Sequence, residues 1–419
     1  MRRRSSLVVL FILLVSLVVG STGRAAATAA RQNTYPIVLV HGFGGWGRDE
    51  VLGFKYWGGF VDIQEHLKSQ GYSTHTAAVG PFSSNWDRAV ELYAQIVGGR
   101  VDYGAAHSAR HGHARYGRTY PGMYPQWGKV DPNTGKPNKV HLVAHSQGGQ
   151  TSRTLVQLLS AGSAEEVAAT PAAELSPLFA TTRKPWVHSV TTIASPHDGT
   201  TLATGVTQFL PFAQQMIALV AAAAGSGGPT LYDFKLDQWG LTRQPNETFD
   251  SFANRVWNSA LWSNTKDISA WDLSPDGAKE LNAWVKAQPD VYYFSWSTEK
   301  TYESWFTGYQ YPEITINPIW SGNAFFMGSY TRNTSGKVPI NSSWWRNDGV
   351  VNTISMNGPK LGSTDQIAAY NGTPRLGAWN DMGLLSSYDH SDVIGIGIYY
   401  DMRGWYANLS NQLAALPLQ

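Results

Sequence analysis

Short apolar runs along the chain predict buried β-strands. Each run is nearly continuous in apolar or β-branched residues, as expected for strands that are covered on both faces. The runs are Ile37–Val40, Val140–Ala144, Val190–Ala194 and Val291–Trp296. Helical patterns such as Val61–Gln70 and Gln147–Leu159 lie between them. Strands that alternate with helices predict an α/β fold with a mostly parallel central sheet, in one domain with insertions.

Two regions depart from this alternation. Residues 84–130 are rich in His, Arg, Tyr and Gly, which predicts a loop-heavy insertion. Residues 199–225 predict helix, because apolar side chains recur there at gaps of three and four. This stripe consists of Leu202, Val206, Phe209, Ala213, Met216 and Val220. Pro211 interrupts it, so we expect two shorter helices or a kink.

The N-terminus resembles a secretory signal peptide. Arg2, Arg3 and Arg4 precede the apolar run Leu7–Gly20, and Ala25–Ala30 offers small residues for cleavage. The apolar run is short for a membrane span, and no stop-transfer pattern follows it, which disfavours an uncleaved anchor. We therefore predict a signal peptide at residues 1–30, a mature domain at 31–419, and secretion to the extracellular space.

Composition narrows the classes of partner and cofactor. Charged residues make up only 15% of the chain and the net charge is +2, so nothing indicates a nucleic-acid partner, and no protein partner is implied. The chain has no cysteine. An exported protein without disulfides depends on its core or on bound metal for stability, so a metal site is worth seeking.

The segment Ala144–Gly148 (AHSQG) predicts a nucleophile elbow, because it follows a predicted strand and opens a predicted helix. Such a turn strains the nucleophile backbone and requires small residues two positions before and after it. Ala144 and Gly148 meet that need, so Ser146 is the predicted nucleophile. The alternative is a serine that caps an ordinary helix.

The segment His41–Gly45 (HGFGG) directly follows the first strand and predicts an oxyanion loop. Acyl transfer passes through a tetrahedral oxyanion that backbone N–H groups must stabilise. In this fold one donor is the residue after the nucleophile, here Gln147, and the other comes from an early HG-type loop, here Phe43. An ordinary strand-to-helix turn is the alternative reading of the glycines.

The expected chain order of Ser, acid and His selects the catalytic base. His188 and His197 precede the region where the acid should fall, so His390 is the predicted general base, and later the general acid. Asp348 in the turn-like segment NDGVV is the leading acid. Asp381 and Asp389 are its rivals, but an aspartate beside a histidine rarely points at its Nδ1 atom.

These motifs resemble the thermoalkalophilic bacterial lipases of the Geobacillus type, a triacylglycerol lipase family with a zinc-bearing insertion. The resemblance runs from about Pro36 to the C-terminus. It is carried by the segments HGFGGWGRDE, GFKYWGG, AVGPFSSNWDRA, DYGAAHSARHGHARYGRTYPG, AHSQGGQT, TTIASPHDGTT, YDFKLDQWGL, NDGVVNT, SMNGPK and WNDMG. It implies an α/β-hydrolase fold with a zinc-bearing insertion at about 84–130 and a helical lid at about 199–225.

Carried over residue by residue, the resemblance implies a triad and an oxyanion hole at positions already singled out. Ser146, Asp348 and His390 match the family's triad. Phe43 and Gln147 match its oxyanion-hole donors. The family also has alanine at the first small position of the elbow.

The metal site is predicted in two ways that disagree over one histidine. Three histidines fall within His107–His113, and His107 and His111 would share a face if the segment were helical. The resemblance instead implies the ligands Asp87, His107, His113 and Asp267. We follow the resemblance, because Gly112 makes an unbroken helix doubtful. Asp272 lies close to Asp267 and is its rival. Four protein ligands leave no open position, so the predicted zinc is structural; the alternative is a basic surface cluster without metal.

The family's calcium site is doubtful in this chain. The matching segment, Asp392–Gly397, has a short Asp392 at one carboxylate position and Gly397 at the other. Calcium prefers several hard oxygen ligands, so we do not predict it here.

The predicted function is a secreted lipase that hydrolyses acylglycerol esters at an interface through a Ser-His-Asp triad. A carboxylesterase or polyester hydrolase with the same triad is the first alternative. A non-catalytic lipid-binding protein on the same scaffold is a remote one.

Overall fold

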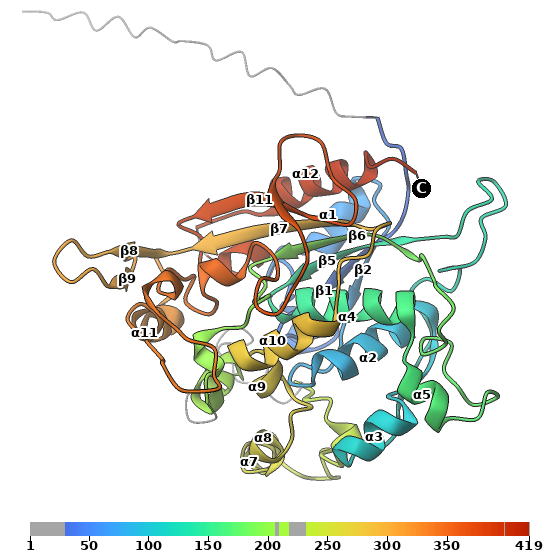
Figure 1. Cartoon of the computed structure of the whole chain (residues 1–419), viewed down its shortest axis with the longest axis horizontal. Helices are drawn as coiled ribbons and strands as arrows, with labels where there is room; N and C mark the ends of the chain where they lie inside the picture. The colour runs from blue at the N-terminus through green and yellow to red at the C-terminus, as the bar shows by residue number, and fades with distance from the viewer. Residues whose placement is uncertain (1–29, 206–208, 218–231, 398, 419) are drawn as a thin grey trace, which may run out of the picture.

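Seven parallel strands form the central sheet (Figure 1). The computed structural model describes residues 30–205, 209–217, 232–397 and 399–418. The sheet order is β10-β11-β7-β6-β5-β1-β2, and every neighbouring pair is parallel. The strands are β1 (Ile37–Val40), β2 (Thr74–Ala77), β5 (Val140–His145), β6 (Val187–Ile193), β7 (Tyr292–Glu299), β10 (Ile367–Ala369) and β11 (Trp379–Ser386). The predicted mostly parallel α/β fold is confirmed.

Two hairpins lie outside this sheet. The first pairs β3 (Gly99–Asp102) with β4 (Tyr116–Tyr120), and the second pairs β8 (Thr301–Glu303) with β9 (Gln310–Pro312). The second hairpin follows β7 directly, so it extends the carboxyl end of a central strand beyond the sheet (Figure 1).

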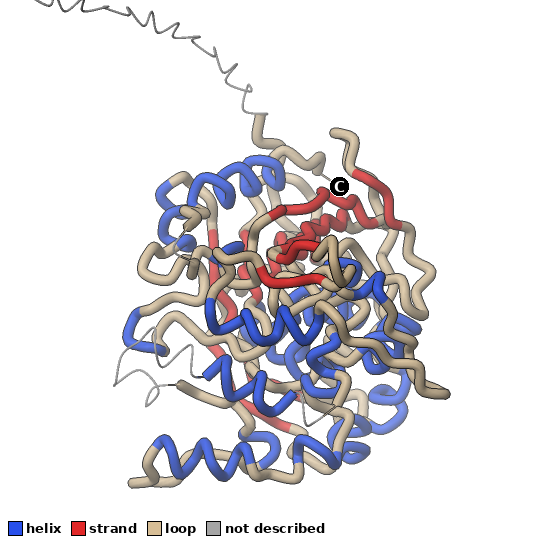
Figure 2. The backbone as a smooth tube through the Cα atoms, turned by 90° about the vertical axis from the view of Figure 1, so that its left-hand side faces the viewer, coloured by secondary structure: helices blue, strands red, loops and turns tan. Residues whose placement is uncertain are grey.

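Helices cover both faces of the sheet, as Figures 1 and 2 show. They are α1 (Ile63–Ser69), α2 (Asn85–Val97), α3 (Ala105–His111), α4 (Gln147–Ala161), α5 (Ala164–Ala169), α7 (Phe249–Trp257), α8 (Leu261–Asn264), α9 (Ser269–Asp272), α10 (Pro275–Trp284), α11 (Pro318–Met327) and α12 (Arg403–Ala414). Alternate side chains of β1 enter two different apolar cores. Ile37 and Leu39 join the core with residues of α1 and α12, while Val38 and Val40 join the core with residues of α2 and α4. This double covering explains the continuous apolar pattern of the strands.

Residues 84–130 differ from the predicted loop-heavy segment, because they begin with a long regular helix. Helix α2 starts at a Ser84 cap, whose side chain accepts a hydrogen bond from the Asp87 amide, and it packs against α4. Its buried face, which includes Ala89 and Leu92, belongs to the apolar core that α2 shares with α4. The glycines and polar residues that suggested loops fall after this helix, where α3 and the β3–β4 hairpin lie.

Residues 209–217 are helical, as predicted for part of the 199–225 segment. Phe209 and Ala213 are buried there, whereas Pro211 is exposed within the helix. The rest of the predicted lid is only partly visible, since residues 206–208 and 218–231 lie outside the described residues. The predicted signal peptide also lies outside them, apart from residue 30. Within the described ranges, no helix is both long and apolar enough to cross a membrane.

Candidate active site and metal centre

Ser146 lies at a strained turn between β5 and α4. Its backbone adopts φ 55° and ψ −132°, in the region that side chains rarely occupy. Glycines are required beside this turn. A Cβ atom at Gly42 would lie 2.5 Å from Ser146 Cβ, and one at Gly148 would lie 2.3 Å from the Val40 carbonyl oxygen. The strand–turn–helix context expected for an exposed nucleophile is therefore present.

His390 and Asp348 form a buried, hydrogen-bonded pair. The Nδ1 atom of His390 lies 2.8 Å from Asp348 Oδ2, and the two side chains are almost fully buried. The other carboxylate oxygen of Asp348 accepts hydrogen bonds from the amides of Val350 and Val351, at 3.0 and 2.8 Å. Thr298 Oγ1 donates to Oδ2 at 2.7 Å. These bonds fix the carboxylate, which in turn orients the imidazole so that Nε2 is free to exchange protons.

The rival acids are engaged elsewhere. Asp389 Oδ1 accepts hydrogen bonds from the amides of Ser391 and Asp392, at 2.9 and 3.0 Å. Asp381 accepts a bond from the Gly383 amide at 2.9 Å. Asp348, although 42 residues away in sequence, is the carboxylate that contacts the His390 ring.

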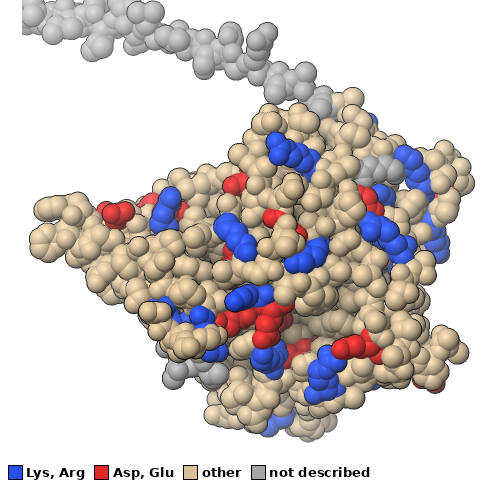
Figure 3. Space-filling view, viewed as in Figure 1, with Lys and Arg blue, Asp and Glu red and all other residues tan. Residues whose placement is uncertain are grey.

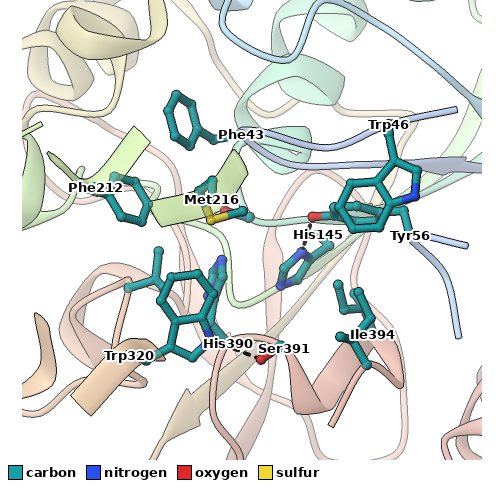
Figure 4. A pocket seen from close by; sticks show the side chains of 13 residues that line it. Phe43, Trp46, Tyr56, His145, Phe212, Met216, Trp320, His390, Ser391 and Ile394 are labelled. Carbon is teal, nitrogen blue, oxygen red and sulfur yellow. Dashed lines mark hydrogen bonds between the residues drawn. The ribbon is translucent and has the colours of Figure 1, made fainter. Parts of the chain in front are cut away.

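Ser146 and His390 line the same pocket, and Figure 4 shows His390 and His145 beside its apolar walls. The ring of His145, next to Ser146, lies 4.4 Å from the ring of His390. The walls are mainly apolar and come from segments far apart in sequence. They include Phe43, Trp46, Phe212, Met216, Trp320, Val350 and Ile394. Phe212 and Met216 belong to the helix at 209–217, so this helix covers the pocket.

The predicted oxyanion-hole residues are close to the nucleophile: Gln147 directly follows Ser146, and Phe43 follows Gly42, which packs against Ser146. The bonds found among the described residues leave both N–H groups without an acceptor. The Gln147 side chain is anchored, because its amide nitrogen donates to the Ser83 carbonyl at 3.2 Å and its oxygen accepts from Ser269 at 2.9 Å. The Phe43 ring stacks on Phe212 at 5.2 Å. Two free backbone donors beside a strained serine can stabilise an oxyanion.

Sequence reasoning missed two residues that brace the oxyanion loop. Tyr56 Oη accepts a hydrogen bond from the Gly42 amide at 2.9 Å and contacts His145 Nδ1 at 2.6 Å (Figure 4). Arg88, fully buried on α2, donates to the carbonyls of His41 and Gly80, at 2.5 and 2.7 Å. Both residues fall in segments that carry the family resemblance, GFKYWGG and AVGPFSSNWDRA, but nothing local in those segments indicates a contact with the oxyanion loop.

Lys300 is a third residue that the sequence did not single out. Its Nζ atom lies 2.6 Å from Asp392 Oδ2 and 3.8 Å from Asp389 Oδ2, and all three side chains are at most 2% exposed. Asp389 and Asp392 flank His390 and Ser391, so the ammonium holds both ends of the loop that carries the imidazole. Burial and the charge of Asp389 raise the pKa of Asp392 to about 6, against the opposing effect of Lys300.

In the segment that matches the calcium site, a side chain at the second position would displace the Asp392 carboxylate. A Cβ atom at Gly397 would lie 1.9 Å from Asp392 Oδ1. The other oxygen of Asp392 is the one paired with Lys300.

Asp87, His107, His113 and Asp267 converge in a second cluster, away from the pocket. One ligand atom from each lies within 4.8 Å of the others. His107 Nε2 is 3.3 Å from Asp87 Oδ1 and 3.1 Å from Asp267 Oδ2. His113 Nε2 is 4.0 and 3.1 Å from the same two oxygens. This cluster could hold a metal ion.

The electrostatics of the cluster favour a cation at its centre. Burial, together with the charge of Asp267, raises the pKa of Asp87. Burial lowers the pKa of His107, but the two carboxylates outweigh it and raise that pKa to about 9. Asp87 Oδ1 and His113 Nε2 are buried without a hydrogen-bond partner among the described residues. Two buried carboxylates and an orphaned imidazole nitrogen are what a divalent cation would satisfy.

The fold also separates the cluster from its rivals. Helix α3 ends at His111, because Gly112 adopts φ 78° in the left-handed region and turns the chain back so that His113 faces His107. His111 stays outside the cluster, although its ring is 4.6 Å from that of His107. Asp272 instead accepts a hydrogen bond from the Asn85 amide at the start of α2. Burial raises the pKa of Asp272 to about 7.

Further residues that the sequence did not identify support the cluster. Gln238 donates to Asp87 Oδ2 at 2.9 Å, and the Trp86 ring stacks on His107 at 4.9 Å. The Ala114 carbonyl lies 2.9 Å from His113 Nδ1, which places the proton on Nδ1 and leaves Nε2 as the ligand atom.

Comparison with known proteins identifies the family of the chain. The family model described as "Lipase-like, C-terminal domain" matches residues 33–415. Lipase 1 of Staphylococcus aureus (strain MRSA252) is 37% identical over 385 residues, which cover 89% of this chain and 52% of that protein. The chain thus spans about half the length of the curated relatives it matches.

Two solved structures are similar over nearly their full length. Lipase 1 from Pelosinus fermentans is 56% identical with a TM-score of 0.86, over 92% of this chain and 100% of that one. EstA from Clostridium botulinum is 48% identical with a TM-score of 0.87, over 93% of this chain and 90% of that one. The predicted bacterial lipase family is confirmed, and the chain belongs to the lipase-like, C-terminal domain family.

Proposed function

We propose that this protein is a secreted lipase that hydrolyses carboxylic ester bonds of acylglycerols through Ser146, His390 and Asp348. The observation that carries the proposal is the buried Asp348–His390 pair, 2.8 Å apart, which shares an apolar pocket with a serine on a strained turn. The lipase names of the relatives and the apolar walls both favour acyl chains as substrate.

The residues support a two-step acyl transfer. Ser146 Oγ attacks the ester carbonyl while His390 Nε2 takes its proton, and Asp348 stabilises the imidazolium. The N–H groups of Phe43 and Gln147 stabilise the oxyanion. His390 then gives its proton to the leaving alcohol, which leaves an acyl-enzyme. Water, deprotonated by the same imidazole, hydrolyses this acyl-enzyme and releases the fatty acid.

The helix at 209–217 is the proposed lid. Its Phe212 and Met216 line the pocket, and Phe212 stacks on Phe43 of the oxyanion loop. A bulky acyl chain requires this helix to move, and the apolar face it exposes would then meet the lipid.

The four-residue cluster is the proposed zinc site. Tetrahedral ligands at about 2.0–2.2 Å from zinc lie about 3.3–3.5 Å from one another. The measured nitrogen–oxygen distances, 3.1 to 4.0 Å, bracket this value. Zinc would join α2, α3 and the segment before α9. Its role would be structural, because four protein ligands leave no position for substrate.

Export is proposed from the first 30 residues, whose arginines, apolar run and small residues resemble a signal peptide. Lipid or ester substrate at an interface is the proposed partner.

Ser146→Ala tests the nucleophile. We expect turnover of p-nitrophenyl esters to fall by about 10⁴-fold or more, with an unchanged unfolding midpoint. Ser195→Ala is the matched control, since Ser195 is a buried serine after the next strand whose Oγ has no hydrogen-bond partner in the described part of the chain. Activity that survives in Ser146→Ala would place the nucleophile elsewhere.

A series of esters from short to long acyl chains, with and without emulsion, separates a lipase from the carboxylesterase or polyester hydrolase alternative. A lipase gains rate with chain length and with interface. No gain from either would refute the lipase assignment and leave an esterase.

A further inference from the structure

The tip of the β8–β9 hairpin exposes two large aromatic side chains to solvent. Trp305 is 94% exposed and Phe306 is 80% exposed. Ile314, just after the hairpin, is fully exposed, and Tyr302 on β8 is 54% exposed. Apolar side chains that gather on one projection, rather than scatter singly, mark a surface that binds something.

The backbone of the tip forms a hydrogen-bonded turn. The Ser304 amide donates to the Tyr309 carbonyl at 2.9 Å, and the Gly308 amide donates to the Ser304 carbonyl at 2.8 Å. Ser304 Oγ accepts from the amides of Phe306 and Thr307, at 3.3 Å each. The turn therefore satisfies polar groups of its own backbone and presents Trp305 and Phe306 to solvent.

The hairpin projects from the edge of the sheet that carries the active site. Ser146 follows the carboxyl end of β5, and the hairpin follows the carboxyl end of β7 (Figure 1). Thr298, on β7 just before the hairpin, donates to the catalytic Asp348. A lipid surface that binds the tip of the hairpin therefore lies on the same side of the molecule as the pocket.

Helix α11 connects the tip to the pocket with further aromatic side chains. Trp320 lines the pocket, and Phe325 on the same helix is 54% exposed. The Phe325 ring lies 5.5 Å from that of Tyr311 on β9. The apolar surface of the hairpin is thus continuous with α11, whose other side forms the pocket wall.

The charge pattern indicates a neutral lipid surface as the occupant. Residues 304–312 (SWFTGYQYP) contain no charged side chain, and Glu303 and Glu313 stand on either side of them. In the face shown in Figure 3, this projection ends in uncharged residues. Tryptophan and tyrosine prefer the lipid–water interface, where an apolar ring and a polar group are both satisfied. Flanking carboxylates give no attraction to anionic headgroups or nucleic acid.

We propose that the β8–β9 hairpin, with Trp305 and Phe306 at its tip, docks this enzyme on neutral lipid surfaces beside the pocket entrance. The proposal rests on the proposed lipase function to explain why docking is useful. The exposed aromatic side chains themselves are observed independently of that function. Docking would hold the pocket next to an insoluble substrate and raise the local ester concentration. It does not change the chemistry inside the pocket.

The test uses the full mature chain and the double variant Trp305→Ser, Phe306→Ser. In flotation assays with phosphatidylcholine vesicles, we expect the variant to bind at least about tenfold more weakly, because two large apolar side chains no longer enter the interface. Turnover of emulsified triolein at limiting interface should fall to a similar extent. Turnover of dissolved p-nitrophenyl butyrate should stay within about twofold of wild type, because neither residue lines the pocket.

Controls separate this proposal from the proposed function. Val130→Ser removes an apolar side chain that is 66% exposed and lies outside the hairpin and the pocket, and it should leave binding unchanged. Ser146→Ala, which tests catalysis, should bind vesicles as wild type does. If wild type binds vesicles but hydrolyses no ester, the docking surface stands and the lipase assignment fails.

Equal vesicle binding and equal triolein turnover by the double variant and wild type would overturn the proposal. A change confined to oligomeric state, measured by light scattering, would also overturn it and assign the aromatic tip to self-association. Binding that appears only with anionic vesicles would overturn the choice of a neutral surface.

Discussion

Replacing Lys300 by methionine removes the cation from a buried pair of carboxylates while it keeps most of the side-chain volume. In the wild type, the Lys300 ammonium contacts Asp392 at 2.6 Å and lies 3.8 Å from Asp389. The rings of Tyr399 and Tyr400 lie 5.3 and 5.5 Å from the same Nζ atom. The substitution leaves Asp392 buried without its countercharge.

The expected cost follows from this burial. Removing one partner of a buried ion pair costs about 3–5 kcal/mol, because the remaining charge has lost its compensation. That is a large part of a typical total stability of about 5–15 kcal/mol. At an unfolding entropy of about 2 cal/mol/K per residue, a chain of this size loses roughly 1 °C for each kcal/mol, so we expect a fall in Tm of about 4–6 °C.

The loss of stability in Lys300→Met also depends on pH. The pKa of Asp392 determines whether this loss increases or decreases as the pH rises. That pKa is raised to about 6 in the folded wild type and rises further without Lys300. Its carboxyl group in the folded variant is therefore neutral at pH 5 and must ionise against burial as the pH rises. The folded state then binds more protons than the unfolded state, so the variant loses stability as the pH rises from about 4 through the folded pKa. We expect the difference from wild type to be larger at pH 8 than at pH 5.

Urea unfolding at several pH values measures both effects. Lys266→Met is the matched control, because Lys266 pairs with Glu280 at 2.7 Å on the surface, where both side chains are more than half exposed. It should change the free energy of unfolding by less than about 1 kcal/mol. Adding Asp392→Asn to Lys300→Met should recover much of the loss, since it removes the uncompensated charge. A Lys300→Met protein as stable as wild type, or equally destabilised at pH 5 and pH 8, would refute the reasoning.

Further predictions concern the active site and the metal centre. Thr298→Val removes a hydrogen bond to the Asp348 carboxylate, so kcat should fall about tenfold while KM changes little; an unchanged kcat would show that the two amide bonds suffice. Tyr56→Phe leaves the buried Gly42 amide without an acceptor and should lower both ester turnover, by about tenfold, and Tm; equal values for variant and wild type would contradict the bracing role. Prolonged chelation should remove one zinc per chain, as measured by elemental analysis, and lower the free energy of unfolding by about 4 kcal/mol relative to protein in excess zinc. His107→Ala should bind no zinc, whereas His111→Ala should bind it normally, and the reverse result would exchange their roles.

Local pattern was enough to predict the strands and the nucleophile turn. A strand covered on both faces must be apolar throughout, and Ile37–Val40 is β1 as predicted. The elbow requires small residues at fixed positions around Ser146, so five consecutive residues are enough to predict it. Chain order then left His390 as the candidate base.

Choosing among neighbouring polar residues needed more than local pattern. From the residues alone, Asp348 competed with Asp381 and Asp389, and His113 competed with His111. The residues favoured Asp348, and the resemblance to a known family strengthened that choice and selected His113. In the structure, Asp348 contacts His390, and His113 rather than His111 lies in the four-residue cluster. The left-handed Gly112 explains the second choice, because it ends α3 and reverses the chain.

Only the tertiary structure revealed the residues that brace these groups. Lys300 and Thr298 stand in no motif, and each acts on a partner distant in sequence. Tyr56 lies in the segment GFKYWGG, but nothing in that segment indicates its hydrogen bond to the Gly42 amide. The exposed aromatic tip of the β8–β9 hairpin could not be predicted from the sequence either, because a segment such as SWFTGY is compatible with a buried strand as well as with a projecting turn. Local sequence specifies backbone conformation and burial pattern, whereas a long-range contact depends on how separate elements pack in three dimensions.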